Sequence, residues 1–158
     1  MLKYVDVMET FSEVPDEITL AINISGCPGR CPGCHSPYLQ EDIGEELKPV
    51  VISDMIAQHD GISCIAFLGG DNDVVGLSRI LKWVKYNSEL KTCWYSGKDE
   101  LKQVDKDMTM PYLDYIKYGS YKESLGPLSS PRTNQRFLKR EGDEWVDITE
   151  KFRVDKAN

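Results

Sequence analysis

The chain has 158 residues, of which 41% are hydrophobic and 28% are charged, and its formal net charge is −7. This length predicts one domain over residues 1–158 with a substantial core, since domains usually have about 100–200 residues. The acidic balance argues against a nucleic-acid partner, which favours a basic surface. The first residues lack the apolar core of a secretory signal, and no apolar run reaches about 18 residues, so we expect a cytoplasmic protein without membrane contact.

Strand-like and helix-like patterns alternate along most of the chain. Apolar and β-branched runs predict strands, whereas apolar residues at helical spacing predict helices. In chain order we expect a strand at 17–25, a helix at 49–58, a strand at 63–68, a helix at 73–87, a strand at 91–96, a helix at 99–104 and a strand at 112–118. This order favours an α/β fold in which parallel strands are joined by right-handed crossovers.

The pattern changes after Gly119. Residues 125–133 are rich in glycine, proline and serine, which predicts a long loop. Two short strands are expected at 136–139 and 145–148, with a turn at 141–143 between them. These strands would extend the sheet at its C-terminal end.

The most informative segment runs from Gly26 to His35 and contains Cys27, Cys31 and Cys34. An iron–sulfur cluster with four irons is usually held by four cysteine thiolates. Three thiolates in one tight loop would leave one iron without a protein ligand, and an open iron can bind a substrate or a cofactor. We therefore interpret this loop as the active site.

Two further cysteines, Cys64 and Cys93, lie in apolar runs that are predicted to be strands. Five cysteines with three of them clustered are a poor disulfide framework. Cysteine in such a run usually behaves as a small hydrophobic residue. We expect both side chains in the core and neither at the cluster.

Four predicted loops follow strands and would lie at the same rim of the fold. In parallel α/β folds, ligand sites gather beyond the carboxyl ends of the strands. The loops in question are the cysteine loop, residues 69–71, residues 96–97 and Gly119. Each one alone is ordinary turn chemistry, but together with a metal-binding motif they predict a cofactor pocket.

Two motifs resemble those of a known superfamily. The spacing Cys27-x3-Cys31-x2-Cys34 is similar to the signature of radical S-adenosylmethionine enzymes. Residues 69–71, with the sequence Gly-Gly-Asp, resemble the glycine-glycine-acid motif of the same enzymes. The chain is thus identified as a radical S-adenosylmethionine domain by resemblance.

Other segments resemble one branch of this superfamily, the activating proteins of anaerobic ribonucleotide reductases. They are residues 31–35 (Cys-Pro-Gly-Cys-His), 94–97 (Trp-Tyr-Ser-Gly), 114–119 and 133–136 (Thr-Asn-Gln-Arg). The small size of the chain also fits this branch. The resemblance extends over about residues 17–140.

The chain departs from the superfamily pattern at a few positions. Many members have an aromatic residue that packs near the adenine just before the third cysteine, whereas this chain has Gly33, and His35 would take part of that role. Asn72 and Asp73 stand where the superfamily usually has a proline after the glycine pair, and residues 12–16 replace its glycine-rich lead-in.

The resemblance implies that the three clustered cysteines, Cys27, Cys31 and Cys34, hold three irons of a [4Fe-4S] cluster. The fourth iron would chelate the amino and carboxylate groups of S-adenosyl-L-methionine, and one electron would cleave this cofactor to methionine and a 5′-deoxyadenosyl radical. No protein side chain would act as a catalytic acid or base, because the cofactors carry the chemistry. The residues implied in cofactor binding are Gly33, Cys34, His35, Gly69, Gly70, Asp71 and Ser96.

The resemblance also implies a protein substrate, the large catalytic subunit of anaerobic ribonucleotide reductase, on which a glycine would become the radical. A flavodoxin or a ferredoxin would donate the electron. A flexible substrate loop must reach the cluster, and a complete eight-unit barrel needs about 250 residues. We therefore expect an incomplete, open (β/α) barrel of mainly parallel strands with a short C-terminal β extension.

Two other functions remain open from the sequence. One is a different radical S-adenosylmethionine enzyme, such as an activase of another glycyl-radical enzyme. The other is a zinc-stapled binding module without catalysis, in which His35 joins the three cysteines. Adjacent Cys34 and His35 disfavour the zinc module, since one tetrahedral ion cannot easily take both.

A local basic patch is the last feature of interest. It consists of Arg132, Arg136, Lys139 and Arg140. The residues fit either solvated charges on a strand or a contact for an anionic cofactor or an acidic partner.

Overall fold

The computed structural model describes residues 1–29, 33–34 and 36–153. Within this part of the chain, no helix is both long enough and apolar enough to span a bilayer. The elements in chain order are β1 (Lys3–Thr10), β2 (Thr19–Ile24), η1 (Pro37–Gln40), β3 (Glu45–Glu46), α1 (Pro49–Ala57), β4 (Cys64–Leu68), α2 (Val74–Asn87), β5 (Lys91–Tyr95), α3 (Gln103–Thr109), η2 (Met110–Tyr112), β6 (Tyr115–Tyr118), β7 (Arg136–Glu141), β8 (Glu144–Asp147) and η3 (Thr149–Phe152).

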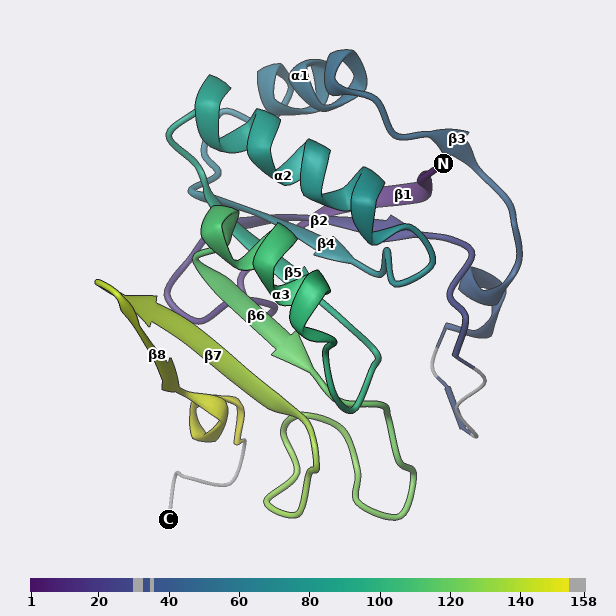
Figure 1. The fold of residues 1–158 in the computed structure, drawn as a ribbon, viewed down its shortest axis with the longest axis vertical. Helices are drawn as coiled ribbons and strands as arrows, with labels where there is room; N and C mark the ends of the chain where they lie inside the picture. The colour runs from purple at the N-terminus through teal and green to yellow at the C-terminus, as the bar shows by residue number, and fades with distance from the viewer. Residues whose placement is uncertain (30–32, 35, 154–158) are drawn as a thin grey trace.

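The strands form one eight-stranded sheet in the order β3-β1-β2-β4-β5-β6-β7-β8 (Figure 1). β2, β4, β5 and β6 run parallel at its centre. Antiparallel strands flank this centre, with β1 and β3 on one side and β7 and β8 on the other. The sheet is open, in agreement with the predicted incomplete barrel, and β7 and β8 are the predicted C-terminal extension.

One element was not predicted, and one predicted helix was misplaced. The sequence analysis did not predict β1, although Lys3–Thr10 pairs along most of its length with β2. The helix expected at 99–104 begins only at Gln103. The Asp99 carboxylate accepts hydrogen bonds from the backbone nitrogen (2.9 Å) and the hydroxyl (2.8 Å) of Ser120. Asp99 therefore binds the loop after β6 and does not begin a helix.

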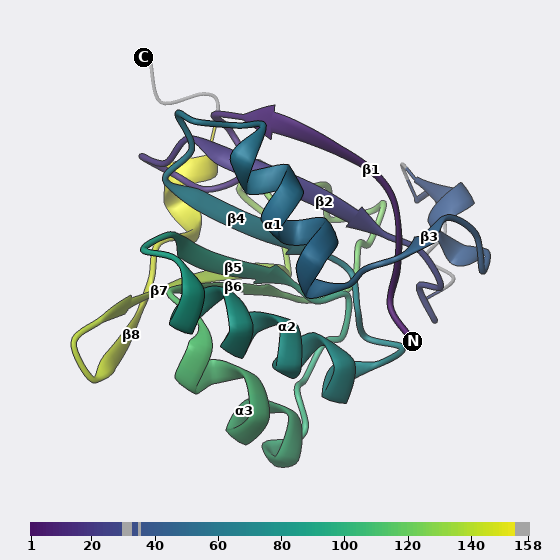
Figure 2. The same ribbon diagram turned by 90° about the horizontal axis from the view of Figure 1, so that it is seen from above.

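The three α-helices lie on one side of the sheet (Figure 2). Alternate residues of the central strands face them, because successive side chains of a strand point to opposite faces. The main core is formed there by buried residues from the strands and helices, among them Ile22, Phe67, Trp94, Ile116, Ile52, Leu77 and Leu81.

The opposite face of the sheet, called here the inner face, has a smaller core. Val14 from the β1–β2 connection and Ile148 from the C-terminal region cover it. Cys64 and Cys93 belong to this core and are 0% exposed, which confirms their predicted packing role. Burial raises the pKa of the Cys64 thiol to about 12, so the thiol stays neutral and unreactive near pH 7.

Candidate functional site

The loops that follow β2, β4, β5 and β6 lie at the same end of the sheet (Figure 1). This arrangement follows from the parallel pairing of these four strands, which places their carboxyl ends side by side. Ligand sites of parallel α/β folds lie at this end. The predicted common rim is therefore present.

The cysteine loop leaves β2 and is closed at its base by two backbone hydrogen bonds. Gly26 donates to Glu41 (2.9 Å), and Cys27 donates to Leu39 (2.8 Å). Gly26 has a φ of +74°, and a Cβ at this position would lie 2.9 Å from the amide nitrogen of Asn72. Glycine is favoured at this exit from β2, because any other residue would be strained at this positive φ and would displace the Asn72 side chain.

The cysteines of this loop are only partly covered by the structure. Cys27 and Cys34 are half-buried. Cys31 and His35, which the sequence analysis assigned to the cluster and to the cofactor, lie outside the described residues. Their predicted roles therefore stay predictions, as does the exact arrangement of the three thiolates.

A cavity of about 180 Å³ lies between the cysteine loop and the ends of the strands. It brings together residues of the cysteine loop and residues of the loops after β4 and β5, as the sequence predicted for the rim. Its lining consists of Ile24, Cys27, Cys34, Ser36, Leu39, Gln40, Leu68, Gly69, Asp71, Tyr95, Ser96, Gly97 and Lys117.

Gly69 makes the turn after β4 at this cavity. Its φ is +119°, and a Cβ there would lie 3.0 Å from the carbonyl oxygen of Ile24. Its backbone nitrogen donates to Tyr95 (3.1 Å), and its carbonyl oxygen accepts from the indole nitrogen of Trp94 (2.8 Å). The residue thus fixes the end of β4 to β5 and lies close to the end of β2, and both of its backbone polar groups already have protein partners.

Asp71 connects the loop after β4 to the loop after β5. Its carboxylate accepts hydrogen bonds from the Ser96 hydroxyl (2.6 Å) and from the Gly97 backbone nitrogen (2.8 Å). The Ser96 hydroxyl also accepts from the Lys98 backbone nitrogen (3.2 Å). Two of the predicted cofactor-binding side chains, Asp71 and Ser96, therefore hold each other in place at the cavity.

Lys117 is the residue of this site that the sequence analysis missed. It is only 8% exposed, and its ammonium nitrogen donates to the carbonyl oxygens of Ser96 (3.1 Å) and Gly119 (2.9 Å). The same nitrogen lies 5.8 Å from the centre of the Tyr95 ring. A lone lysine in the apolar strand 115–118, just before a glycine, was the available signal.

Tyr95 provides the aromatic wall of the cavity beside Lys117. Its hydroxyl donates to the backbone carbonyl oxygen of Glu13 in the β1–β2 connection. Burial raises the pKa of the Tyr95 phenol well above its ordinary value, so the hydroxyl is a neutral donor. The cavity thus combines a buried cation, a neutral aromatic ring and two half-buried thiols.

Two predicted cofactor-binding residues, Gly33 and Gly70, are not part of the cavity lining. Gly70 has a φ of +103°, and a Cβ there would lie 3.3 Å from a methyl carbon of Leu77, so this residue serves the turn into α2. Gly33 has a φ of +73° and lies against the side chain of Glu123. Neither arrangement tests the predicted contacts with a cofactor.

Comparison with known protein families identifies the family of this chain. Residues 18–137 match the model of the 4Fe-4S single cluster domain, and no curated protein matches the chain. The match covers most of the chain, which therefore belongs to this family. This is the radical S-adenosylmethionine type of domain found in activating enzymes, and it supports a [4Fe-4S] cluster.

Proposed function

We propose that this member of the 4Fe-4S single cluster family cleaves S-adenosyl-L-methionine reductively and activates a glycyl-radical enzyme. The observation that carries the proposal is the single cavity that unites Cys27 and Cys34 with Asp71, Ser96 and buried Lys117. Thiolates are the ligands that iron–sulfur clusters prefer, so the donor set fits the cluster.

When bound, the cluster and S-adenosyl-L-methionine together supply the one-electron cleavage that yields methionine and the 5′-deoxyadenosyl radical. The protein must hold the cofactor, orient it and exclude competing reactions. Cys27 and Cys34, together with Cys31, would hold the cluster.

The electrostatics of the cavity fit the methionyl end of S-adenosyl-L-methionine, which has one anionic and one cationic group. Lys117 places a buried positive charge that favours the carboxylate. Asp71 places a carboxylate that favours the ammonium group, and its bonds to Ser96 and Gly97 fix its orientation. This preorganisation reduces the cost of ordering side chains when the cofactor binds.

The inner face of the sheet is exposed to solvent at β1. Met8 of β1 pairs with Ala21, Ala21 with Ala66, and Ala66 with Cys93, so these residues share the inner face. Met8 is 59% exposed, whereas Cys93 is buried, so the face is open toward β1 and covered toward β5. At the cavity itself Cys27 and Cys34 are half-buried, and this partial exposure supports a protein substrate whose glycine loop reaches the cavity.

As the partner we propose the large catalytic subunit of anaerobic ribonucleotide reductase, with a flavodoxin or a ferredoxin as electron donor. The test is anaerobic incubation of the reconstituted protein with reductant, S-adenosyl-L-methionine and the candidate subunit. We expect 5′-deoxyadenosine and a glycyl-radical spectrum on the subunit. Formation of 5′-deoxyadenosine without that radical would reject this partner and favour another glycyl-radical enzyme or a small substrate.

A further inference from the structure

The side chain of Glu123, in the connection between β6 and β7, lies directly against Gly33 of the cysteine loop. A Cβ built on Gly33 would lie 2.8 Å from one carboxylate oxygen of Glu123 and 2.9 Å from its carboxyl carbon. Gly33 immediately precedes Cys34 in the sequence. A carboxylate from a distant part of the chain is thus in contact with the segment that would hold the cluster.

The connection that bears Glu123 is fixed on both sides of this residue. Ser120 is bound through Asp99, and its carbonyl oxygen accepts from the Asn134 side chain (3.0 Å). The carbonyl oxygen of Ser124 accepts from the guanidinium of Arg132 (3.2 Å). Residues 122–126 form a tight turn with an antiparallel bridge between its ends, so Glu123 projects from a fixed position.

The charge of Glu123 is not compensated by an ion pair within the described residues. The buried ammonium group of Lys117 lines the cavity and donates to the backbone carbonyl oxygens of Ser96 and Gly119. Charges near an iron–sulfur cluster are among the factors that set its reduction potential. A fixed negative charge disfavours the state with the added electron.

We propose that Glu123 lowers the reduction potential of the cluster held by the cysteine loop. The inference rests on the cluster-binding part of the proposed function. The couple takes up one electron from an external low-potential reductant, and no bond or proton changes at Glu123. The carboxylate makes the reduced cluster a stronger donor, which suits the reductive cleavage of a sulfonium.

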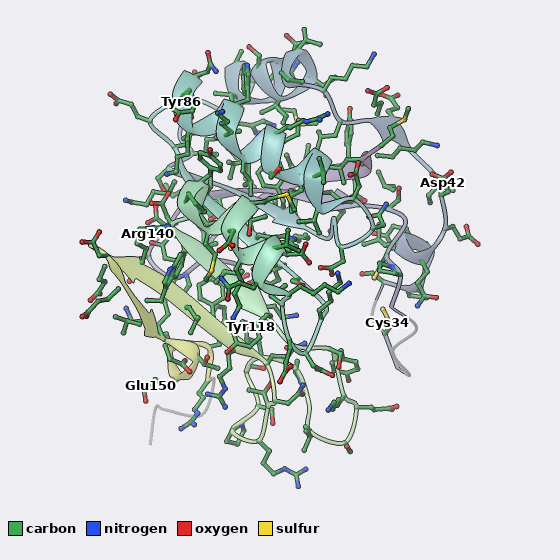
Figure 3. All side chains as sticks on the ribbon, in the orientation of Figure 1. Cys34, Asp42, Tyr86, Tyr118, Arg140 and Glu150 are labelled. Carbon is green, nitrogen blue, oxygen red and sulfur yellow. The ribbon has the colours of Figure 1, made fainter. Side chains whose placement is uncertain are left out.

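The test is a charge series at position 123, measured as the midpoint potential of the anaerobically reconstituted protein. Glu123→Gln removes the charge, Glu123→Lys inverts it and Glu123→Asp retains it. Position 123 is exposed, so these side chains do not disturb the core. Glu150→Gln is the matched control, because Glu150 is exposed and lies on the opposite side of the molecule from Cys34 (Figure 3).

We expect the potential to become more positive in Glu123→Gln and more positive again in Glu123→Lys. Glu123→Asp and Glu150→Gln should stay near the wild type. The difference in midpoint potential between Glu123→Gln and the wild type should shrink as ionic strength rises, because the screening length for exposed charges is about 10 Å at 0.1 M salt and shorter above it.

Equal potentials across the series, with full cluster content, would overturn the proposal. A uniform shift in Glu123→Gln, Glu123→Lys and Glu123→Asp would also overturn it, because contact geometry and not charge would then be the cause. Absence of a cluster from the wild-type protein would contradict the proposed function itself.

Discussion

The cysteine loop and the cavity wall that faces it are stabilised in different ways. The wall is formed by the ends of β4, β5 and β6 and by the loops after β4 and β5, and hydrogen bonds within this region fix Asp71, Ser96 and Lys117. In the cysteine loop, the described backbone bonds that tie it to the fold lie at its base, at Gly26 and Cys27. The wall is therefore preorganised by the protein, whereas the cysteine loop supplies the thiolates that would bind the metal.

The largest effect is expected in the cysteine loop itself. Cys34→Ser should abolish the [4Fe-4S] cluster, because a hydroxyl is a poor substitute for a thiolate ligand. The sheet and helices should remain, since the main core does not include the loop. Iron content and visible absorption measure the first outcome, and far-ultraviolet circular dichroism measures the second.

Cys64→Ala is the matched control for this prediction. Cys64 is 0% exposed in the core of the inner face, so its truncation should cost about 1–2 kcal/mol of stability while cluster content stays intact. Loss of iron in this variant as well would show that cluster content depends on the inner core, and the effect of Cys34→Ser would then not be specific to the cysteine loop.

The next effect is expected in the wall of the cavity. Lys117→Met removes the donor that two buried carbonyl oxygens share, which should cost about 1–3 kcal/mol of unfolding free energy. If Lys117 binds the carboxylate of the cofactor, affinity for S-adenosyl-L-methionine should fall about ten- to one hundredfold. Urea unfolding measures the loss of stability, and equilibrium binding of S-adenosyl-L-methionine measures the loss of affinity.

Lys139→Met serves as control for Lys117, because Lys139 pairs opposite Tyr115 in β7 and is not part of the cavity lining. It should leave affinity for the cofactor unchanged. An equal loss of affinity in both variants would indicate a general effect of charge and would remove Lys117 from the proposed binding site.

A smaller effect tests the rigidity of the turn after β4. Gly69→Ala should destabilise the protein by about 1–3 kcal/mol, because φ is +119° and the Cβ would lie 3.0 Å from a carbonyl oxygen. At Gly61, a Cβ has no neighbour within 4 Å, so Gly61→Ala should be neutral or slightly stabilising. The thermal unfolding midpoints of the two variants measure these effects, and equal midpoints would contradict the predicted strain at Gly69.

The smallest effect concerns the Asp99–Ser120 contact between two rim loops. The backbone and hydroxyl of Ser120 lower the pKa of the Asp99 carboxyl below its ordinary value. Its contribution to stability is therefore present above about pH 4 and is lost as pH falls through the folded-state pKa. Asp99→Asn should lower the unfolding midpoint at pH 6 and have less effect at pH 2.

Asp143→Asn, in the turn between β7 and β8, is the control for this pH dependence. Its unfolding midpoint should follow that of the wild type at both pH values. A loss in Asp99→Asn that is equally large at pH 2 and pH 6 would show that the carboxylate charge is not what holds the two loops together.

The central strands were predictable because their apolar runs are long and end in glycine. β1 was missed because its residues are mostly half-buried or exposed, so it lacks the continuous apolar run that marked β4. Helix α3 was misplaced because Asp99 is held by its bonds to Ser120 in the fold, and the helix begins only at Gln103. Local patterns do not contain such long-range contacts.

The candidate site was predictable in its motifs but not in its internal bonding. Cysteine spacing and the glycine turns indicated which loops meet. The bond between Asp71 and Ser96 depends on the register between β4 and β5, and the entry of Lys117 into the same cavity depends on the register between β5 and β6. The sequence specifies neither register. The residues of the basic patch have different partners. The guanidinium carbon of Arg140 lies 4.8 Å from the centre of the Trp145 ring, whereas a guanidinium nitrogen of Arg136 lies 3.5 Å from a carboxylate oxygen of Asp147.

The most direct test of the account is the spin-resonance spectrum of the anaerobically reconstituted, dithionite-reduced protein, recorded with and without S-adenosyl-L-methionine. We predict about four irons per chain, a reducible cluster and a spectrum that changes when the cofactor is added. Stoichiometric zinc without a reducible cluster, or a cluster whose spectrum is unaffected by the cofactor, would contradict the proposed function.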